Sequence, residues 1–137
     1  MAVTTAEAAV GRKLLQAVQA PNWTAIARCF APEASFRVLT PGPLRTFTGP
    51  EEAAERFRFW LEPLEELEFL ESDVEVIADR VRIRYRFRGR DPEKGWQLNE
   101  HTGYAEVEDG RIVTLNMTCA GFRPTTEPER RPGRVPT

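Results

Sequence analysis

The sequence predicts one α+β domain in which a curved antiparallel sheet and three helices enclose an apolar pocket. Three observations indicate this fold class. Apolar residues recur at helical spacing in three segments of the first half of the chain. The segment 81–89 alternates strictly between apolar residues and arginines, as is typical of a strand with one buried face. Asp109-Gly110 separates two further strand-like runs, as expected of a hairpin.

The helical segments are predicted at residues 5–19, 23–30 and 51–61. Thr4 or Thr5 is expected to cap the first helix, and Asn22 the second. Pro50 suits the start of the third, where a missing N–H has no consequence. The side chains expected to face the core are Val10, Leu14, Leu15, Val18, Trp23, Ile26, Ala27, Phe30, Ala54, Phe57, Phe59 and Trp60.

Two short and four long strands complete the predicted domain. The prolines and glycine at 41–43 interrupt any continuous strand and separate the two short ones. From residue 123 the chain is rich in proline and charge and has almost nothing to bury, so residues 123–137 are predicted to be a disordered tail after a domain of residues 1–122. The predicted strands are 35–39, 44–48, 67–78, 81–89, 97–108 and 111–122.

A two-residue turn at Asp79-Arg80 would pair Val81 with Ala78 and satisfy both faces of the hairpin. The apolar residues then meet on one face, and arginines meet acidic residues on the other. We therefore interpret the arginine row as a charge ladder rather than a nucleic-acid-binding stripe. The predicted opposite pairs are Ile83 with Val76, Tyr85 with Val74, Arg84 with Glu75, Arg86 with Asp73 and Arg88 with Glu71.

The turn at Asp109-Gly110 allows two registers, which exchange the faces of the last strand. A plain two-residue turn pairs Val107 with Ile112 and directs Thr114, Asn116 and Thr118 inward. A turn with a glycine bulge pairs Val107 with Arg111 instead. We favour the bulge because it gives a mostly apolar interior, with Val113, Leu115, Met117 and Cys119 on the face of Val107, Ala105 and His101.

Composition and charge point away from several classes of protein. The formal net charge of −2 gives no general reason to expect nucleic acid or a membrane as a partner. Cys29 and Cys119 are expected to be reduced and buried, and with a single histidine they cannot complete a zinc site. No signal peptide or membrane-spanning stretch is recognisable, so a cytoplasmic location is expected. No nucleotide, phosphate-loop or metal motif is present, and we expect no cofactor.

The order and spacing of three motifs resemble the nuclear transport factor 2-like superfamily, also called SnoaL-like. The resemblance covers roughly residues 5 to 122 and implies a cone, in which the sheet wraps the helices around a cavity. It also implies a homodimer through the outer face of the sheet. The motifs are Asn22-Trp23-x-x-Ile26-x-x-x-Phe30-Ala31-Pro32-Glu33-Ala34-x-Phe36, Phe47-x-Gly49-Pro50-Glu51 and Glu106-Val107-Glu108-Asp109-Gly110-Arg111-Ile112-Val113.

Members of this superfamily include isomerases, cyclases, hydrolases and non-catalytic association domains, so the fold alone does not give the chemistry. In ketosteroid isomerases a carboxylate base works with a tyrosine and a protonated acid. By the resemblance, those three positions fall on Leu14, Val38 and Gly103, so this activity is not expected. The acidic residues of limonene epoxide hydrolases and SnoaL cyclases are not matched either.

The remaining polar groups predicted to face the interior are few, and they define the candidate site. His101 could act as a general base or relay a proton, with Tyr85 as a hydrogen-bond donor and Asn99 fixing the imidazole tautomer. The predicted ligand-binding residues are Asn99, Trp60, Phe57, Phe36, Phe87, Met117 and Trp23.

The sequence supports two hypotheses. One is a pocket that binds a small, largely hydrophobic molecule, with or without acid–base catalysis. The other is a non-catalytic association module that uses the outer sheet face.

Overall fold

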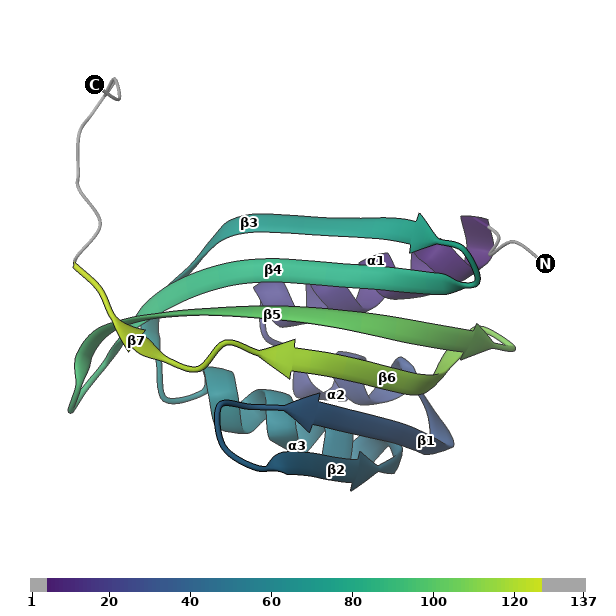
Figure 1. Cartoon of the computed structure of the whole chain (residues 1–137), viewed down its shortest axis with the longest axis horizontal. Coiled ribbons are helices and arrows are strands. Elements are labelled where there is room, and N and C mark those ends of the chain that lie inside the picture. Colours follow the sequence, from purple (N-terminus) through teal and green to yellow (C-terminus); the bar gives the residue numbers. More distant parts are fainter. Residues whose placement is uncertain (1–4, 127–137) are drawn as a thin grey trace, which may run out of the picture.

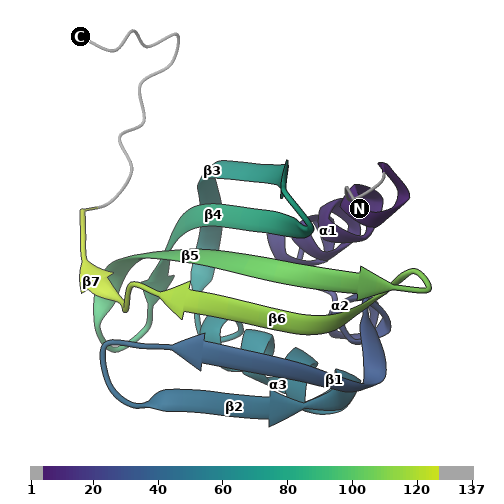
Figure 2. The same cartoon turned by 45° about the vertical axis from the view of Figure 1, so that its right-hand side comes forward.

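Three helices lie against one face of a curved sheet (Figures 1 and 2). A computed structural model describes residues 5–126 of the chain. The sheet order is β2-β1-β6-β5-β4-β3, and β7 pairs with β5. The predicted fold class is confirmed. The elements are α1 Thr5–Gln19, α2 Trp23–Arg28, β1 Phe30–Leu39, β2 Leu44–Thr48, α3 Gly49–Leu61, β3 Glu65–Ile77, β4 Arg80–Asp91, β5 Gly95–Glu108, β6 Arg111–Cys119 and β7 Arg123–Pro124.

Different turns and helix ends lie at the two ends of this cone. The β1–β2 loop, the β4–β5 turn, β7 and the end of α3 lie together at the left of Figure 1. The β3–β4 and β5–β6 turns lie at the opposite end, near the start of α1. We refer to the end with β7 as the open end of the cone.

The first two helices begin where the sequence predicts. The Asn22 side chain accepts a hydrogen bond from the Ala25 N–H at 3.0 Å, as expected of an N-cap. The predicted caps of α1 are not tested, since Thr4 and the side chain of Thr5 lie outside the described residues. α2 ends at Arg28 rather than at Phe30, because Phe30 already pairs with Ile112 of β6.

The third helix begins two residues earlier than predicted, at Gly49. The N–H of Thr48, just before this helix, donates a hydrogen bond at 2.8 Å to the side chain of Glu52 in the first turn. One predicted core residue is wrong: Phe59 is 62% exposed. It follows Phe57 by two positions, which places it on the opposite side of the helix.

The bounds of β3, β4 and β5 differ from the predicted ones by one or two residues, and larger departures occur at β1 and after β6. β1 starts five residues before the predicted Ser35, because parallel pairing with β6 extends the strand through Ala31-Pro32-Glu33, with a register irregularity there. The last predicted strand ends at Cys119, and the chain then returns as β7 to pair with Gln97 and Leu98 of β5. The sheet therefore continues beyond the predicted domain boundary at residue 122. The rest of the predicted tail, 127–137, lies outside the described residues.

Near its turn, between Glu71 and Arg86, the β3–β4 hairpin keeps the predicted faces but not the predicted partners. Its turn is Ala78-Asp79, with Ala78 in the left-handed region at φ 54°, so Val81 pairs with Val76 instead of Ala78. A turn one residue earlier moves the partners of residues 81–86 by two positions, and a shift of two preserves the alternation of faces. A further register irregularity between Phe69 and Glu71 moves the partner of Arg88 by three positions. The corrected pairs include Ile83 with Val74, Tyr85 with Ser72, Arg84 with Asp73, Arg86 with Glu71 and Arg88 with Glu68.

The arginine row forms a charge ladder, as predicted. Each arginine from Arg80 to Arg90 on the outer face forms at least one ion pair with an acidic residue of β3, β5 or the β3–β4 turn. Arg86, for example, bridges Glu71 of β3 and Glu100 of β5. The positive charge of the row is thus compensated within the chain.

The plain two-residue turn forms at Asp109-Gly110, so the favoured bulge at the turn is wrong. Glu108 pairs with Arg111 and Val107 with Ile112. Both turn residues have positive φ, at 51° and 75°, which suits a tight type I′ hairpin.

The favoured faces of β6 are nevertheless confirmed from Leu115 to Cys119, whereas at the start of the strand Ile112 rather than Val113 is fully buried. The pairing changes register immediately after the turn, so that Glu106 pairs with Thr114 and the extra residue is Val113. This irregularity exchanges the two faces of β6, so that from Thr114 on the strand has the inward-facing residues that the bulged turn would have given. Leu115, Met117 and Cys119 are therefore buried on the same face as Ala105 and His101.

Close packing of α1 on β4 depends on a glycine. A Cβ atom at Gly11 would lie 2.8 Å from Val81 Cγ1 and 3.2 Å from Val74 Cγ1. We expect Gly11→Ala to lower the free energy of unfolding by about 1–3 kcal/mol, although alanine favours a helix. Urea denaturation measures this change. In a Val81→Ala background the same substitution should cost less, because the methyl it meets is gone. A more stable Gly11→Ala protein would contradict this packing.

Among residues 5–126, no helix is long and apolar enough to cross a bilayer.

Candidate functional site

The candidate site is centred on a cross-strand pair, Tyr85 of β4 and His101 of β5. The Tyr85 hydroxyl lies 2.8 Å from His101 Nδ1, within hydrogen-bond distance. Both side chains are inside the cone, with 1% and 0% of their surface exposed. The predicted strand parity is confirmed at these two positions.

Aromatic rings enclose the imidazole. The Trp60 ring centroid lies 4.2 Å from that of His101, and the Phe87 centroid lies 5.3 Å from it. Phe57 contacts Trp60 edge-on, and Phe36 stacks on Phe57 at 5.5 Å. The structure therefore brings together the predicted polar pair and four of the predicted aromatic residues.

Three other predicted site residues are placed differently. Asn99 is buried on the same face as His101, but its Oδ1 accepts from the Glu100 N–H at 2.7 Å and its Nδ2 donates to Cys119 Sγ at 3.5 Å. It does not hold the imidazole, because Tyr85 takes Nδ1. Met117 packs against the backbone of Gly103, and Trp23 borders an open groove on the helical side with Arg58. Trp23 is not part of the cluster.

Burial keeps the Tyr85–His101 pair uncharged. It lowers the pKa of His101 to about 3, with a smaller contribution from the positive charge of Arg56. Burial also raises the pKa of Tyr85 well above its usual value. His101 Nε2 is buried and has no hydrogen-bond partner among the described residues. When the Tyr85 hydroxyl donates to Nδ1, Nε2 carries the ring hydrogen and is a free donor. The pair is therefore suited to donating a hydrogen bond rather than to holding a proton.

Arg56 of α3 belongs to this site and was missed in the sequence. Its guanidinium carbon lies 4.4 Å from the Phe59 ring centroid, 5.1 Å from that of Trp60 and 5.4 Å from that of Phe47. Its Nε is buried without a hydrogen-bond partner among the described residues, and burial lowers its pKa. The signal available was its spacing of four residues from Trp60, which places both on one side of the helix.

The interior is packed, so the predicted pocket around His101 is closed. Tyr85 and His101 line none of five cavities that border the described residues. One of them, a cavity of about 200 Å³ at the open end, is lined by Trp60 and Phe122. Phe122 contacts Phe87 at 5.9 Å between centroids. Trp60 lines this cavity and also contacts His101, so its indole separates the two, while Phe87 lies between Phe122 and His101.

The cavity at the open end combines apolar walls with a few polar groups. Its apolar walls come from the end of α3, the following turn and Phe122, and its polar groups from the β4–β5 hairpin. This composition is typical of small-molecule sites. Besides Trp60 and Phe122, the residues that line this cavity are Phe59, Pro63, Leu64, Asp91, Lys94 and Gln97.

The three positions that the sequence resemblance assigns to ketosteroid isomerase catalytic groups lie in the packed core. Leu14 and Val38 are 1% and 0% exposed. A Cβ atom at Gly103 would lie 2.9 Å from Leu115 Cδ1, so no acidic side chain fits there without rearrangement. Among residues 5–126, no group of three or more His, Cys, Asp or Glu residues is placed to hold a metal ion.

Comparison with solved structures places this fold among known ones. An NTF2-like protein from Burkholderia thailandensis superposes with a TM-score of 0.69 at 18% identity, covering 85% of this chain and 92% of that one. A protein with a ketosteroid isomerase-like fold from Catenulispora acidiphila, in complex with trimethylamine, gives 0.63 at 14% identity, with 79% and 82% covered. A phenazine biosynthesis-related protein from Pseudomonas aeruginosa gives 0.62 at 15% identity, with 82% and 76% covered.

These identities support a common fold and no shared chemistry. No curated protein matches the chain. The model of the SnoaL-like domain family matches residues 12–115, which is most of the described structure. The motifs, the cone and this match together show that the chain belongs to the SnoaL-like domain family.

Proposed function

We propose that this protein binds a small, largely hydrophobic molecule with one carbonyl oxygen at the open end of the cone, where Trp60 separates the cavity from His101. The observation that carries the proposal is His101 Nε2, a buried polar atom without a partner among the described residues. An unsatisfied buried polar atom costs roughly 1–3 kcal/mol. A ligand oxygen that reaches Nε2 would remove that cost.

Access to His101 requires Trp60 to turn. The cavity of about 200 Å³ already borders Trp60, and Phe59 at its rim is 62% exposed. If the indole of Trp60 turns toward solvent, the cavity extends to the imidazole of His101, because the centroids of these two rings are only 4.2 Å apart. The ligand then occupies the space that Trp60 leaves, between Phe57 and Phe87.

The chemistry that suits this pair is polarisation of a carbonyl. A neutral imidazole can donate a hydrogen bond to an oxygen that gains negative charge, as the neutral histidine of triosephosphate isomerase does. With a pKa of about 3, His101 does so without carrying a proton of its own at neutral pH. The Tyr85 hydroxyl keeps the hydrogen on Nε2. This role replaces the general base predicted from the sequence.

The association hypothesis stays a prediction with weaker support. The arginines of the outer face already have acidic partners within the chain. A second subunit would therefore gain little from neutralising them.

Binding of acetophenone, compared with ethylbenzene, tests the proposed function. We expect acetophenone to bind roughly fivefold more tightly, because it adds one hydrogen bond of about 1 kcal/mol from His101. Quenching of tryptophan fluorescence reports binding; it should persist in Trp23→Phe and weaken in Trp60→Phe. His101→Phe should abolish the preference for the ketone. Equal affinities in the unmodified protein would refute the role of His101, and unchanged quenching in Trp60→Phe would refute the site.

A further inference from the structure

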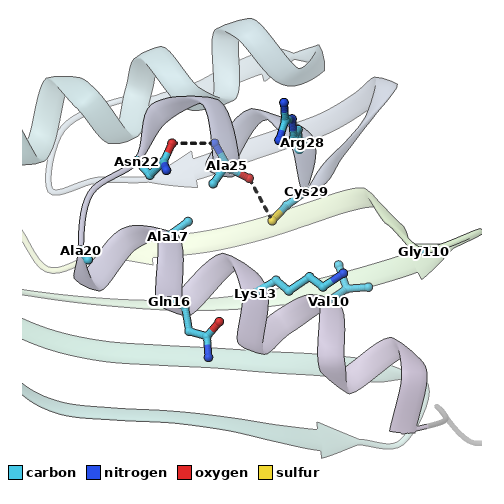
Figure 3. Close-up of a pocket in the computed structure, with 10 residues that line it drawn as sticks. All are labelled: Val10, Lys13, Gln16, Ala17, Ala20, Asn22, Ala25, Arg28, Cys29 and Gly110. Carbon is cyan, nitrogen blue, oxygen red and sulfur yellow. Dashed lines mark hydrogen bonds between the residues drawn. The ribbon is translucent and has the colours of Figure 1, made fainter.

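A second cavity, separate from the open end, lies between α1 and α2 (Figure 3). Its volume is about 420 Å³, within the usual range for small-molecule sites. Gly110 of the β5–β6 turn closes one side, which places this groove at the end of the cone opposite β7. It shares no lining residue with the cavity at Trp60.

Among residues 5–126, the charged residues that line this groove are two cations, Lys13 of α1 and Arg28 of α2. Neither forms an ion pair with another of the described residues, in contrast to the arginine row of β4. The described lining of the groove therefore has two positive charges and no carboxylate, and the acidic residues on the Arg28 side, Glu51 and Glu52, line a neighbouring cavity instead. That arrangement attracts an anion.

The remaining lining is mostly apolar and is firmly held. Val10 and Ala17 of α1 are buried beneath the groove, with 5% and 6% of their surface exposed. The Asn22 N–H donates to the Ala17 carbonyl at 3.0 Å, which fixes the connection between the two helices. The Cys29 thiol, on the α2 side, donates to the Ala25 carbonyl at 3.4 Å. A preformed apolar floor beside a cationic rim suits an amphipathic molecule.

Lys13 and Cys29, which both line the groove, interact electrostatically. Burial raises the pKa of the Cys29 thiol, and the Lys13 ammonium opposes that increase. The ammonium and the sulfur are therefore within electrostatic range of each other.

We propose that the groove between α1 and α2 binds an organic carboxylate with an apolar chain. The carboxylate lies between Lys13 and Arg28, since guanidinium and ammonium groups both form strong charge-assisted hydrogen bonds with it. The apolar chain covers Val10 and Ala17. A bare inorganic anion would leave this apolar floor unused, so the chain contributes to affinity.

Titration of the isotope-labelled full chain with octanoate, followed by NMR, tests this proposal. We expect the amide signals of Lys13, Cys29 and Gly110 to shift. The double variant Lys13→Gln/Arg28→Gln should bind roughly tenfold or more weakly, because two charge-assisted hydrogen bonds are lost. Arg12→Gln is the matched control; it removes an exposed neighbouring cation that does not line the groove, and should leave affinity unchanged.

Two further compounds serve as controls in the titration: a neutral alcohol that lacks the carboxylate, and an inorganic anion that lacks the apolar chain. Octanol should bind more weakly than octanoate by a similar factor, and inorganic phosphate should produce no comparable shift at these amides. The proposal is overturned if the double variant keeps full affinity, if octanol binds as well as octanoate, or if phosphate binds more tightly. Shifts confined to the surroundings of Trp60 and Lys94 would also overturn it, and would place the ligand at the open end.

Alkylation of Cys29 gives an independent readout. Iodoacetamide at pH 8.5 should modify Cys29 severalfold more slowly when octanoate is saturating, because the thiol lines the occupied groove. Peptide mass mapping separates Cys29 from Cys119, which lines none of the described cavities and whose rate should not change. Protection that persists in the double variant, or no protection at all, contradicts the site.

Discussion

Replacing Phe57 with alanine is expected to lower the free energy of unfolding by about 3–5 kcal/mol. The Phe57 side chain is 0% exposed, stacks on Phe36 at 5.5 Å and meets Trp60 edge-on at 5.4 Å. Its removal leaves a cavity directly beneath the indole that contacts His101. Because the fold has closed around these rings, the surroundings can relax only partly. The urea midpoint should fall without a change in the denaturant slope.

Phe59→Ala is the matched control on the same helix. Phe59 is 62% exposed and contacts the Arg56 guanidinium, so its loss should change stability by only about 0.5 kcal/mol. Equal losses at Phe57 and Phe59 would show that the α3 face described above is wrong.

Acid should destabilise the protein through His101, and the sign follows from its pKa. The imidazole has a pKa of about 3 in the folded chain and about 6.5 when unfolded. Between these values the unfolded chain binds a proton that the folded chain rejects. The stabilisation is therefore complete above pH 6.5 and is lost as the pH falls toward 3. Each pH unit within that window removes about 1.4 kcal/mol.

His101→Gln separates this effect from the titration of the carboxylates. Glutamine keeps a polar partner for the Tyr85 hydroxyl, but it does not titrate, whereas the carboxylates of the variant titrate as in the unmodified protein. Between pH 8 and 4.5, the unmodified protein should lose about 3 kcal/mol more than the variant, as measured by urea denaturation at each pH. Parallel pH dependences of the two proteins would mean that His101 is protonated, or accessible to water, in the folded state.

The faces of the elements could be predicted from the sequence because periodicity is a local property. The stripe of α1, from Val10 to Val18, and the alternation of β4 place the same residues inside as the structure does. That Tyr85 and His101 both face the interior follows from two strand parities, whereas their position opposite each other depends on the register of β4 and β5. The prediction that Phe59 faces the core is wrong, because its position two residues after Phe57 places it on the outer side of α3 despite its hydrophobic side chain.

The partners across the sheet could not be predicted from local signals. The β3–β4 turn is shifted by one residue, and the register change at Val113 comes after the turn rather than in it. Strands slide in steps of two without changing faces, so several registers satisfy the same pattern. The choice among them depends on the whole sheet.

The sequence by itself determined the fold class, the buried face of β4 and the inward direction of Tyr85 and His101. Only the tertiary structure decided that Trp60 fills the expected pocket, that Asn99 bonds to Cys119, and that Lys13 and Arg28 border a common groove. The reason is physical. Which way a side chain faces is set by the backbone repeat of its own element, whereas whether a space is filled depends on the volumes of side chains that arrive from several elements at once.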